Sequence, residues 1–173
     1  MIIIRNITDM NNVYFISDYH FNHKNVLIYE SRPFYSVEEM NETLIRNWNS
    51  VIKKSDKVFV PGDFGFGSKE AITKIVSRLR GNKVLIMGNH DKRKTVSWWQ
   101  DVGFKEVIKY PIIWSETFIL SHEPLKTVPE GYVNIHGHIH SKKVSDENKY
   151  FNVSCESLNY YPISFKEILL RLK

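Results

Sequence analysis

Five short segments of the chain carry side chains that can bind a metal ion. All seven histidines of the sequence lie within or next to them, which scattered structural histidines would not do. Imidazole nitrogen and carboxylate oxygen without thiolate suit Mn²⁺, Fe, Zn²⁺ or Ni²⁺. The ligands are too many for one tetrahedral ion, so we expect two divalent metal ions, with Mn²⁺ favoured. The segments are SDYH at 17–20, PGD at 61–63, MGNHD at 87–91, LSH at 120–122 and HGHIH at 136–140.

The spacing inside these segments is compatible with shared sites. In an extended backbone, residues two positions apart point the same way. We therefore expect Asp18 and His20 to face one site together, and likewise His138 and His140. A glycine precedes three of the candidate ligands, where it allows a sharp turn or a close approach of the backbone.

Each of the five segments follows a predicted strand. Ligands at the carboxyl ends of strands converge in a crevice in layered α/β folds, so the placement supports the residue types. Short runs rich in β-branched and aromatic residues predict the strands. These runs cover 13–17, 57–61, 83–87, 104–114, 117–121, 132–136 and 150–154.

Three amphipathic helices are also predicted. The first covers about 37–53, after a capping box of Ser36 and Glu39; the second begins at Ser68; the third follows a capping box of Ser164 and Glu167. The first half alternates strand and helix, which favours parallel pairing. The second half runs strand after strand, which favours antiparallel pairing. We expect a layered α/β fold with two packed sheets and helices outside.

Composition limits the class of protein. The 173 residues fit one domain, 1–173, and no apolar run reaches the roughly 20 residues that a membrane span needs. Cys155 is the only cysteine, so no intrachain disulfide can form, and we expect a soluble, cytoplasmic protein that does not bind membranes. The net charge of +5 favours anionic partners such as phosphate compounds.

The five motifs, in this order, resemble the calcineurin-like metallophosphoesterase superfamily. The resemblance extends from Asp18 to His140. It implies a four-layer α/β/β/α sandwich of two mixed sheets flanked by helices. It also implies a two-metal site whose bridging hydroxide attacks phosphorus. The implied ligands are Asp18, His20 and His140 for the first metal, Asn89, His122 and His138 for the second, and Asp63 as the bridge.

The resemblance also assigns residues that contact the substrate. His90 is implied to donate a proton or contact phosphate rather than to bind metal. Many family members have a second Asp, three residues after the bridging one, that orients this histidine. Phe66 stands there, so another group must orient His90. We assign Asn89, His90 and Arg93 to the substrate; a solvated loop is the alternative for the basic run 92–94 that contains Arg93.

The favoured function is hydrolysis of phosphodiester bonds in nucleotides or similar small phosphorylated compounds, with phosphomonoesters left open. The alternative is a metal-dependent nuclease, in which Arg78, Arg80, Lys83 and the run 92–94 follow a nucleic-acid backbone. A non-catalytic scaffold of the same fold is disfavoured, because every ligand and His90 are present. The oligomeric state stays open.

Overall fold

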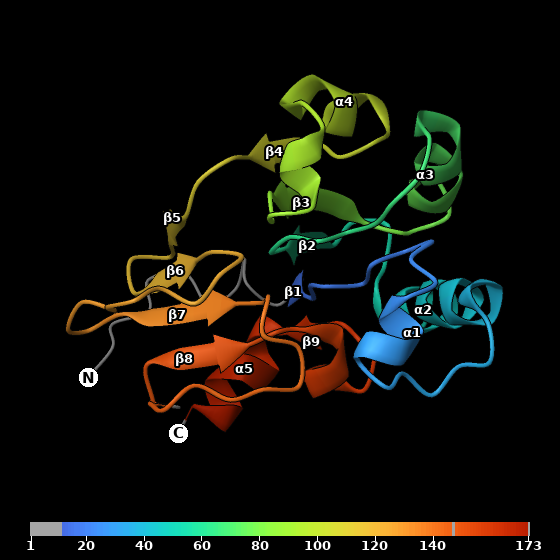
Figure 1. The fold of residues 1–173 in the computed structure, drawn as a ribbon. Helices are drawn as coiled ribbons and strands as arrows, with labels where there is room; N and C mark the ends of the chain where they lie inside the picture. The colour runs from blue at the N-terminus through green and yellow to red at the C-terminus, as the bar shows by residue number, and fades with distance from the viewer. Residues whose placement is uncertain (1–11, 147, 173) are drawn as a thin grey trace.

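Two β-sheets form the centre of the molecule, and Figure 1 shows them with helices outside. The structure is a computed structural model that describes residues 12–146 and 148–172. The five-stranded sheet has the order β4-β3-β2-β1-β9, with β1 to β4 parallel and β9 antiparallel to β1. Its strands are β1 (Val13–Phe15), β2 (Lys57–Val60), β3 (Asn82–Ile86), β4 (Glu106–Ile108) and β9 (Ile163–Ser164).

The four-stranded sheet corrects one prediction. Its order is β5-β6-β7-β8, and only β5 and β6 pair antiparallel; β6 with β7 and β7 with β8 are parallel. A parallel crossover needs about a dozen residues and is usually helical. Here the described parts of both crossovers are irregular, so strand followed strand in the sequence without a helical pattern between them. The strands are β5 (Ile112–Trp114), β6 (Phe118–Leu120), β7 (Val133–His136) and β8 (Tyr150–Asn152).

The run 104–114, predicted as one strand, is also corrected. It forms β4 in the first sheet and β5 in the second, and the chain passes between the sheets at 109–111. Pro111 has no N–H to donate to a ladder, so a continuous strand is disfavoured at this point.

The predicted helices begin at their caps. Ser36, Ser68 and Ser164 each accept a backbone N–H three residues later, and only Ser164 closes a full capping box. Within the described residues, no helix is long and apolar enough to cross a membrane. The helices are α1 (Val26–Tyr29), α2 (Val37–Val51), α3 (Lys69–Val76), α4 (Val96–Asp101) and α5 (Phe165–Arg171).

An aromatic core joins the two sheets. Phe15 on β1 stacks on Phe59 on β2, with ring centroids 5.4 Å apart. Trp114 on β5 meets both rings edge-on, at 5.3 and 5.4 Å. Phe165, at the start of α5, packs on Trp114 at 4.8 Å and on Phe118 of β6 at 5.0 Å. These contacts fix the sheets face to face, and the four-layer α/β/β/α sandwich is confirmed.

Candidate metal centre

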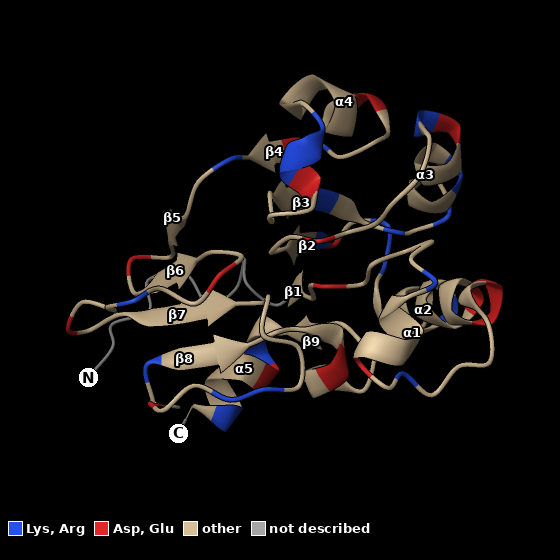
Figure 2. Cartoon of the chain, viewed as in Figure 1, with Lys and Arg blue, Asp and Glu red and all other residues tan. Residues whose placement is uncertain are grey.

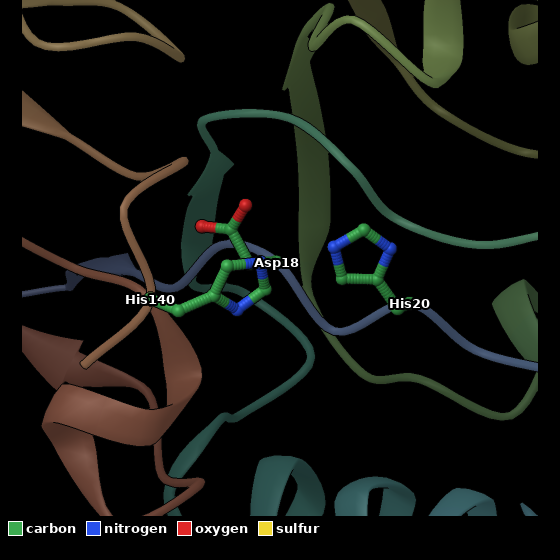
Figure 3. A group of neighbouring side chains, drawn as sticks. All are labelled: Asp18, His20 and His140. Atoms are coloured by element: carbon green, nitrogen blue, oxygen red, sulfur yellow. The ribbon is translucent and has the colours of Figure 1, made fainter. Parts of the chain in front are cut away.

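The five motif segments meet where β1, β2, β3, β6 and β7 end. Two groups of side chains have ligand atoms within 4.8 Å of one another: Asp18, His20 and His140, and Asp63, His122 and His138. Figure 3 shows the first group, with Asp18 and His20 on the segment after β1 and His140 on the segment after β7. Each group therefore contains residues from segments that follow strands of both sheets.

The first group contains buried polar atoms that lack a partner. Asp18 Oδ2 accepts hydrogen bonds from Ser17 Oγ (2.6 Å), Ser154 Oγ (2.9 Å) and the backbone N–H of His138 (2.9 Å). Among the described residues, Asp18 Oδ1 and both ring nitrogens of His20 have none. Buried lone pairs without a partner are costly. A cation bound here would satisfy Asp18 Oδ1 and the one ring nitrogen of His20 that carries a lone pair.

The second group brings several lone pairs together. The Nδ1 atom of His122 lies 2.9 Å from the carbonyl oxygen of Pro61, so in the neutral ring this nitrogen donates. The Nε2 atom then carries a lone pair. It faces Asn89 Oδ1 at 2.8 Å, His138 Nδ1 at 3.1 Å and Asp63 Oδ2 at 3.5 Å. Acceptors that face one another in this way fit a shared cation.

Asp63 lies between the two groups. Its Oδ2 atom is 3.8 Å from His20 Nε2 in the first group and 3.5 Å from His122 Nε2 in the second. Its Oδ1 atom accepts the backbone N–H of His90 at 3.0 Å. Burial, reinforced by the Asp18 carboxylate, raises the pKa of Asp63 to about 6. The position and the desolvated carboxylate are suited to a bridging ligand.

Burial also keeps most of the histidines neutral. It lowers the pKa values of His20 and His138; neighbouring positive groups act in the same direction, and at His138 the carboxylates of Glu123 and Asp18 partly oppose the shift. Burial alone would lower the pKa of His140, but a hydrogen bond to Glu156 and the charge of that carboxylate raise it. Neutral imidazole is the form that binds a metal.

The ligand segments are not extended, which corrects the expected geometry. Their backbones adopt the left-handed region at five candidate ligands, a conformation that costs about 1–3 kcal/mol per residue and is concentrated at functional sites. Asp18 and His20 do share one group, whereas His138 and His140 belong to different groups. The φ angles are 56° at Asp18, 50° at His20, 53° at Asp63, 71° at His138 and 52° at His140.

Two glycines allow the segments to approach closely. A Cβ atom on Gly88 would overlap the carboxylate of Asp63. A Cβ atom on Gly137 would overlap the side chains of Ser17 and Asp18. Gly88 thus allows close approach of the segments after β2 and β3 within one sheet, and Gly137 allows close approach between the two sheets.

His90 is held by rings rather than by a carboxylate. Its Nε2 atom is 3.8 Å from Asp63 Oδ2, and its buried Nδ1 atom has no partner among the described residues. The ring meets Phe66 edge-on at 5.1 Å and His20 at 5.4 Å. Phe66, which stands where many family members have Asp, thus packs on the histidine that such an Asp would bond.

Asp91 does not orient His90. Its buried carboxylate accepts the backbone N–H groups of Asp63 (2.6 Å), Phe64 (3.1 Å) and Gly88 (2.9 Å). It therefore joins the segments that follow β2 and β3. The aspartate of the GNHD motif therefore holds these two backbone segments together by hydrogen bonds.

Arg93 lies on the short 3₁₀ turn η2 (Asp91–Arg93), directly after His90. Its side chain is exposed, as is that of Asn89. Burial lowers the pKa of His90, and the positive charge of Arg93 lowers it further. The substrate role of Arg93 stays a prediction.

Sequence reasoning missed Arg32 and Glu156. Arg32 is buried and donates from Nη2 to the carbonyl oxygen of Asp18 (2.6 Å) and from Nη1 to that of Tyr19 (2.7 Å). Its Nε atom donates to Glu156 Oε1 (2.9 Å), which in turn lies 2.9 Å from His140 Nδ1. A carboxylate on the far nitrogen of a ligand histidine fixes the orientation of its ring. This network therefore connects both parts of the first group.

Comparisons with known proteins identify the family of the chain. The family model for "Calcineurin-like phosphoesterase" matches residues 12–171. The chain is 38% identical to "Uncharacterized protein MJ1445" of Methanocaldococcus jannaschii, over 92% of this chain and 90% of that protein. It is 30% identical to "Gene 66 protein" of Mycobacterium phage L5, over 78% and 80%. A solved protein of unknown function from Aquifex aeolicus, AQ665, superposes with a TM-score of 0.71 at 26% identity, over 92% of this chain and 98% of that one.

Fold and site thus define a metallophosphoesterase. The chain belongs to the calcineurin-like phosphoesterase family. Membership supports a phosphoric ester hydrolase that depends on divalent metal ions, and the His and Asp groups provide positions for them.

Proposed function

We propose that this protein hydrolyses phosphodiester bonds of nucleotides or similar small phosphorylated compounds. The observation that carries the proposal is the meeting of two ligand groups at Asp63 Oδ2, with His90 beside them. Two cations bound there would neutralise charge on a phosphoryl group and lower the pKa of water. Mn²⁺ is favoured, with Fe, Zn²⁺ or Ni²⁺ as alternatives. The proposed ligands are Asp18, His20 and His140, then Asn89, His122 and His138, with Asp63 shared.

Two residues of the chain would then have separate roles in the reaction. His90 is partly exposed, at 32% of its side chain, so it can reach a leaving oxygen while its ring rests on Phe66. Proton donation from this position would contribute roughly 10²–10⁴-fold. The exposed guanidinium of Arg93 would bind a phosphoryl oxygen that does not react. A phosphomonoester reaction stays the alternative at the same site.

Two of the basic residues that would have to contact a nucleic-acid backbone already bind other groups of the protein. This supports a small substrate over a nucleic acid. Lys83 is buried and donates to the carbonyl oxygens of Leu79 (2.8 Å) and Gly81 (3.0 Å). Arg78 forms an ion pair with Glu42 at 2.6 Å. We also propose a cytoplasmic location, consistent with the single, unpaired cysteine.

The test measures metal content and hydrolysis together. Protein reconstituted with Mn²⁺ should hold two ions per chain and cleave bis-p-nitrophenyl phosphate faster than p-nitrophenyl phosphate. Asp63→Asn removes the charge shared by both groups, so we expect it to abolish activity and reduce metal content. One ion or none in the wild type, or faster monoester hydrolysis, would refute the proposal.

A further inference from the structure

A cavity lies beside the second ligand group. It has a volume of about 300 Å³, and His122 forms part of its wall. Three lysines line it from three different parts of the chain: Lys92 on the turn η2, Lys109 between β4 and β5, and Lys126 between β6 and β7. In Figure 2, basic stretches are blue beside β3 and in the connection from β4 to β5. The three lysines therefore line one space from separate segments.

The three lysines are free to bind an anion. Their side chains are exposed, and none forms an ion pair or hydrogen bond within the part of the chain that the structure describes. Lys57 and Lys69, by contrast, are paired with Glu106 (3.4 Å) and Asp101 (2.7 Å). Glu123 is the acidic residue on the described wall, so positive charge dominates. Lysine binds phosphate as a point charge, which suits this arrangement.

The walls of the cavity are fixed without a ligand. The backbone N–H of Leu125 donates to the buried side chain of Asn134 (2.9 Å), and the Tyr150 hydroxyl donates to the carbonyl oxygen of Leu125 (2.7 Å). The Ser121 hydroxyl closes the same loop by donating to the carbonyl oxygen of Glu123 (2.6 Å). A preformed site avoids the entropic cost of ordering a loop on binding.

We propose that this cavity binds a second phosphate group of the substrate. The inference rests on the proposed function and narrows the substrate class to phosphodiesters that carry a phosphate besides the one that reacts. Because His122 belongs to both the metal centre and the cavity wall, the two phosphates would lie in neighbouring sites. Lys92, Lys109 and Lys126 would then determine specificity, not the chemical step.

The experiment compares two substrates that differ by one phosphate. They are the p-nitrophenyl ester of thymidine 5′-phosphate, with and without a 3′-phosphate, and each is given to the Mn²⁺-loaded protein. We expect a lower KM for the 3′-phosphorylated ester. Lys109→Gln and Lys126→Gln should each raise that KM roughly tenfold, as expected for a lost charged hydrogen bond, and leave kcat and the KM of the plain ester unchanged. Lys54→Gln, an exposed lysine before β2, is the matched control.

A binding measurement separates this inference from the proposed function. Calorimetry with thymidine 3′,5′-bisphosphate and thymidine 5′-phosphate should give tighter binding of the bisphosphate, and the two lysine variants should remove the difference. Failure to hydrolyse either ester would overturn the proposed function, while the calorimetry would still test the cavity. Equal affinity for the two nucleotides would overturn the inference. So would tighter binding of a single-stranded oligonucleotide than of the bisphosphate.

Discussion

His90 owes its position to aromatic packing. Its ring meets Phe66 at 5.1 Å, and the carboxylate of Asp91 points instead to the backbone of neighbouring segments. The nearest carboxylate oxygen, Asp63 Oδ2, is 3.8 Å from Nε2, beyond hydrogen-bond distance. Burial and Arg93 both lower its pKa, so the protonated ring that can donate to a leaving oxygen becomes more populated as the pH falls.

We expect His90→Ala to reduce kcat by roughly 10²–10⁴-fold, because it removes a proton donor and not a ligand. Two Mn²⁺ ions per chain should remain, as measured by metal analysis beside steady-state kinetics. His23→Ala is the matched control, since His23 packs on the same Phe66 ring at 4.4 Å. It should retain most of the activity. Loss of a metal ion in His90→Ala would show that the histidine is a ligand.

For single residues, the sequence predicted which side chains meet at the site. It did not predict the hydrogen bonds that fix their positions. Asp18 and Asp63 lie in short motifs after predicted strands, so the adjacent residues in the sequence identify them. Arg32 and Glu156 are 124 positions apart, one in a loop and the other in a short 3₁₀ turn, and their hydrogen bond depends on the completed fold. The left-handed backbone at the ligands is likewise imposed by contacts between segments, such as that of the Asp18 N–H with the carbonyl oxygen of Gly62 (3.1 Å).

Among the elements, the 3₁₀ turn η3 (Cys155–Leu158) is joined to the loop before α2 by the ion pair of Arg32 and Glu156. Burial alone would raise the pKa of Glu156, but the hydrogen bond with His140 and the charge of Arg32 lower it to about 2. The pKa of the folded state is thus below the ordinary value of 4.5. The carboxylate stabilises the folded protein above pH 4.5, and that stability is lost as the pH falls towards 2.

We therefore predict that Glu156→Gln lowers the free energy of unfolding at neutral pH, by on the order of 3 kcal/mol. The variant should also lose less stability than the wild type as the pH falls from 4.5 towards 2. Urea titrations of metal-free protein in chelator measure both effects. Glu42→Gln, which breaks the exposed pair with Arg78, should change little. Identical acid profiles for Glu156→Gln and the wild type would contradict the prediction.

Elements with local signals were predicted best. The N-caps Ser36, Ser68 and Ser164 marked α2, α3 and α5, because a cap acts within one turn. The direction of β7 and β8 was missed, since parallel pairing across an irregular loop leaves no periodic pattern in the sequence. Pro111 was a usable signal that the run 104–114 breaks.

Across the whole molecule, the net charge of +5 is distributed rather than concentrated. Figure 2 shows basic and acidic segments interspersed over both sheets and the outer helices, with one basic run at the turn η2. Such a surface attracts polyanions weakly from a distance. It does not present the long basic track of a protein that grips a nucleic-acid strand.

We predict that cleavage of a model diester changes little between about 50 and about 200 mM salt, whereas a protein that contacts several phosphates would lose affinity by orders of magnitude. The assay compares bis-p-nitrophenyl phosphate, a cyclic nucleotide and single-stranded DNA at both salt levels. Strong, salt-sensitive cleavage of DNA with negligible cleavage of the small diesters would reverse the ranking and favour the nuclease.

The division of each ligand group between the two sheets has a consequence for biosynthesis. Asp18, His20 and Asp63 are translated early, but each group also needs residues from 122–140. On the proposed assignment, a nascent chain holds neither complete set until the segment 136–140 has left the ribosome. Cation uptake then follows translation instead of guiding it. We therefore expect the supply of metal to limit maturation of the protein after these segments are translated, and not their translation.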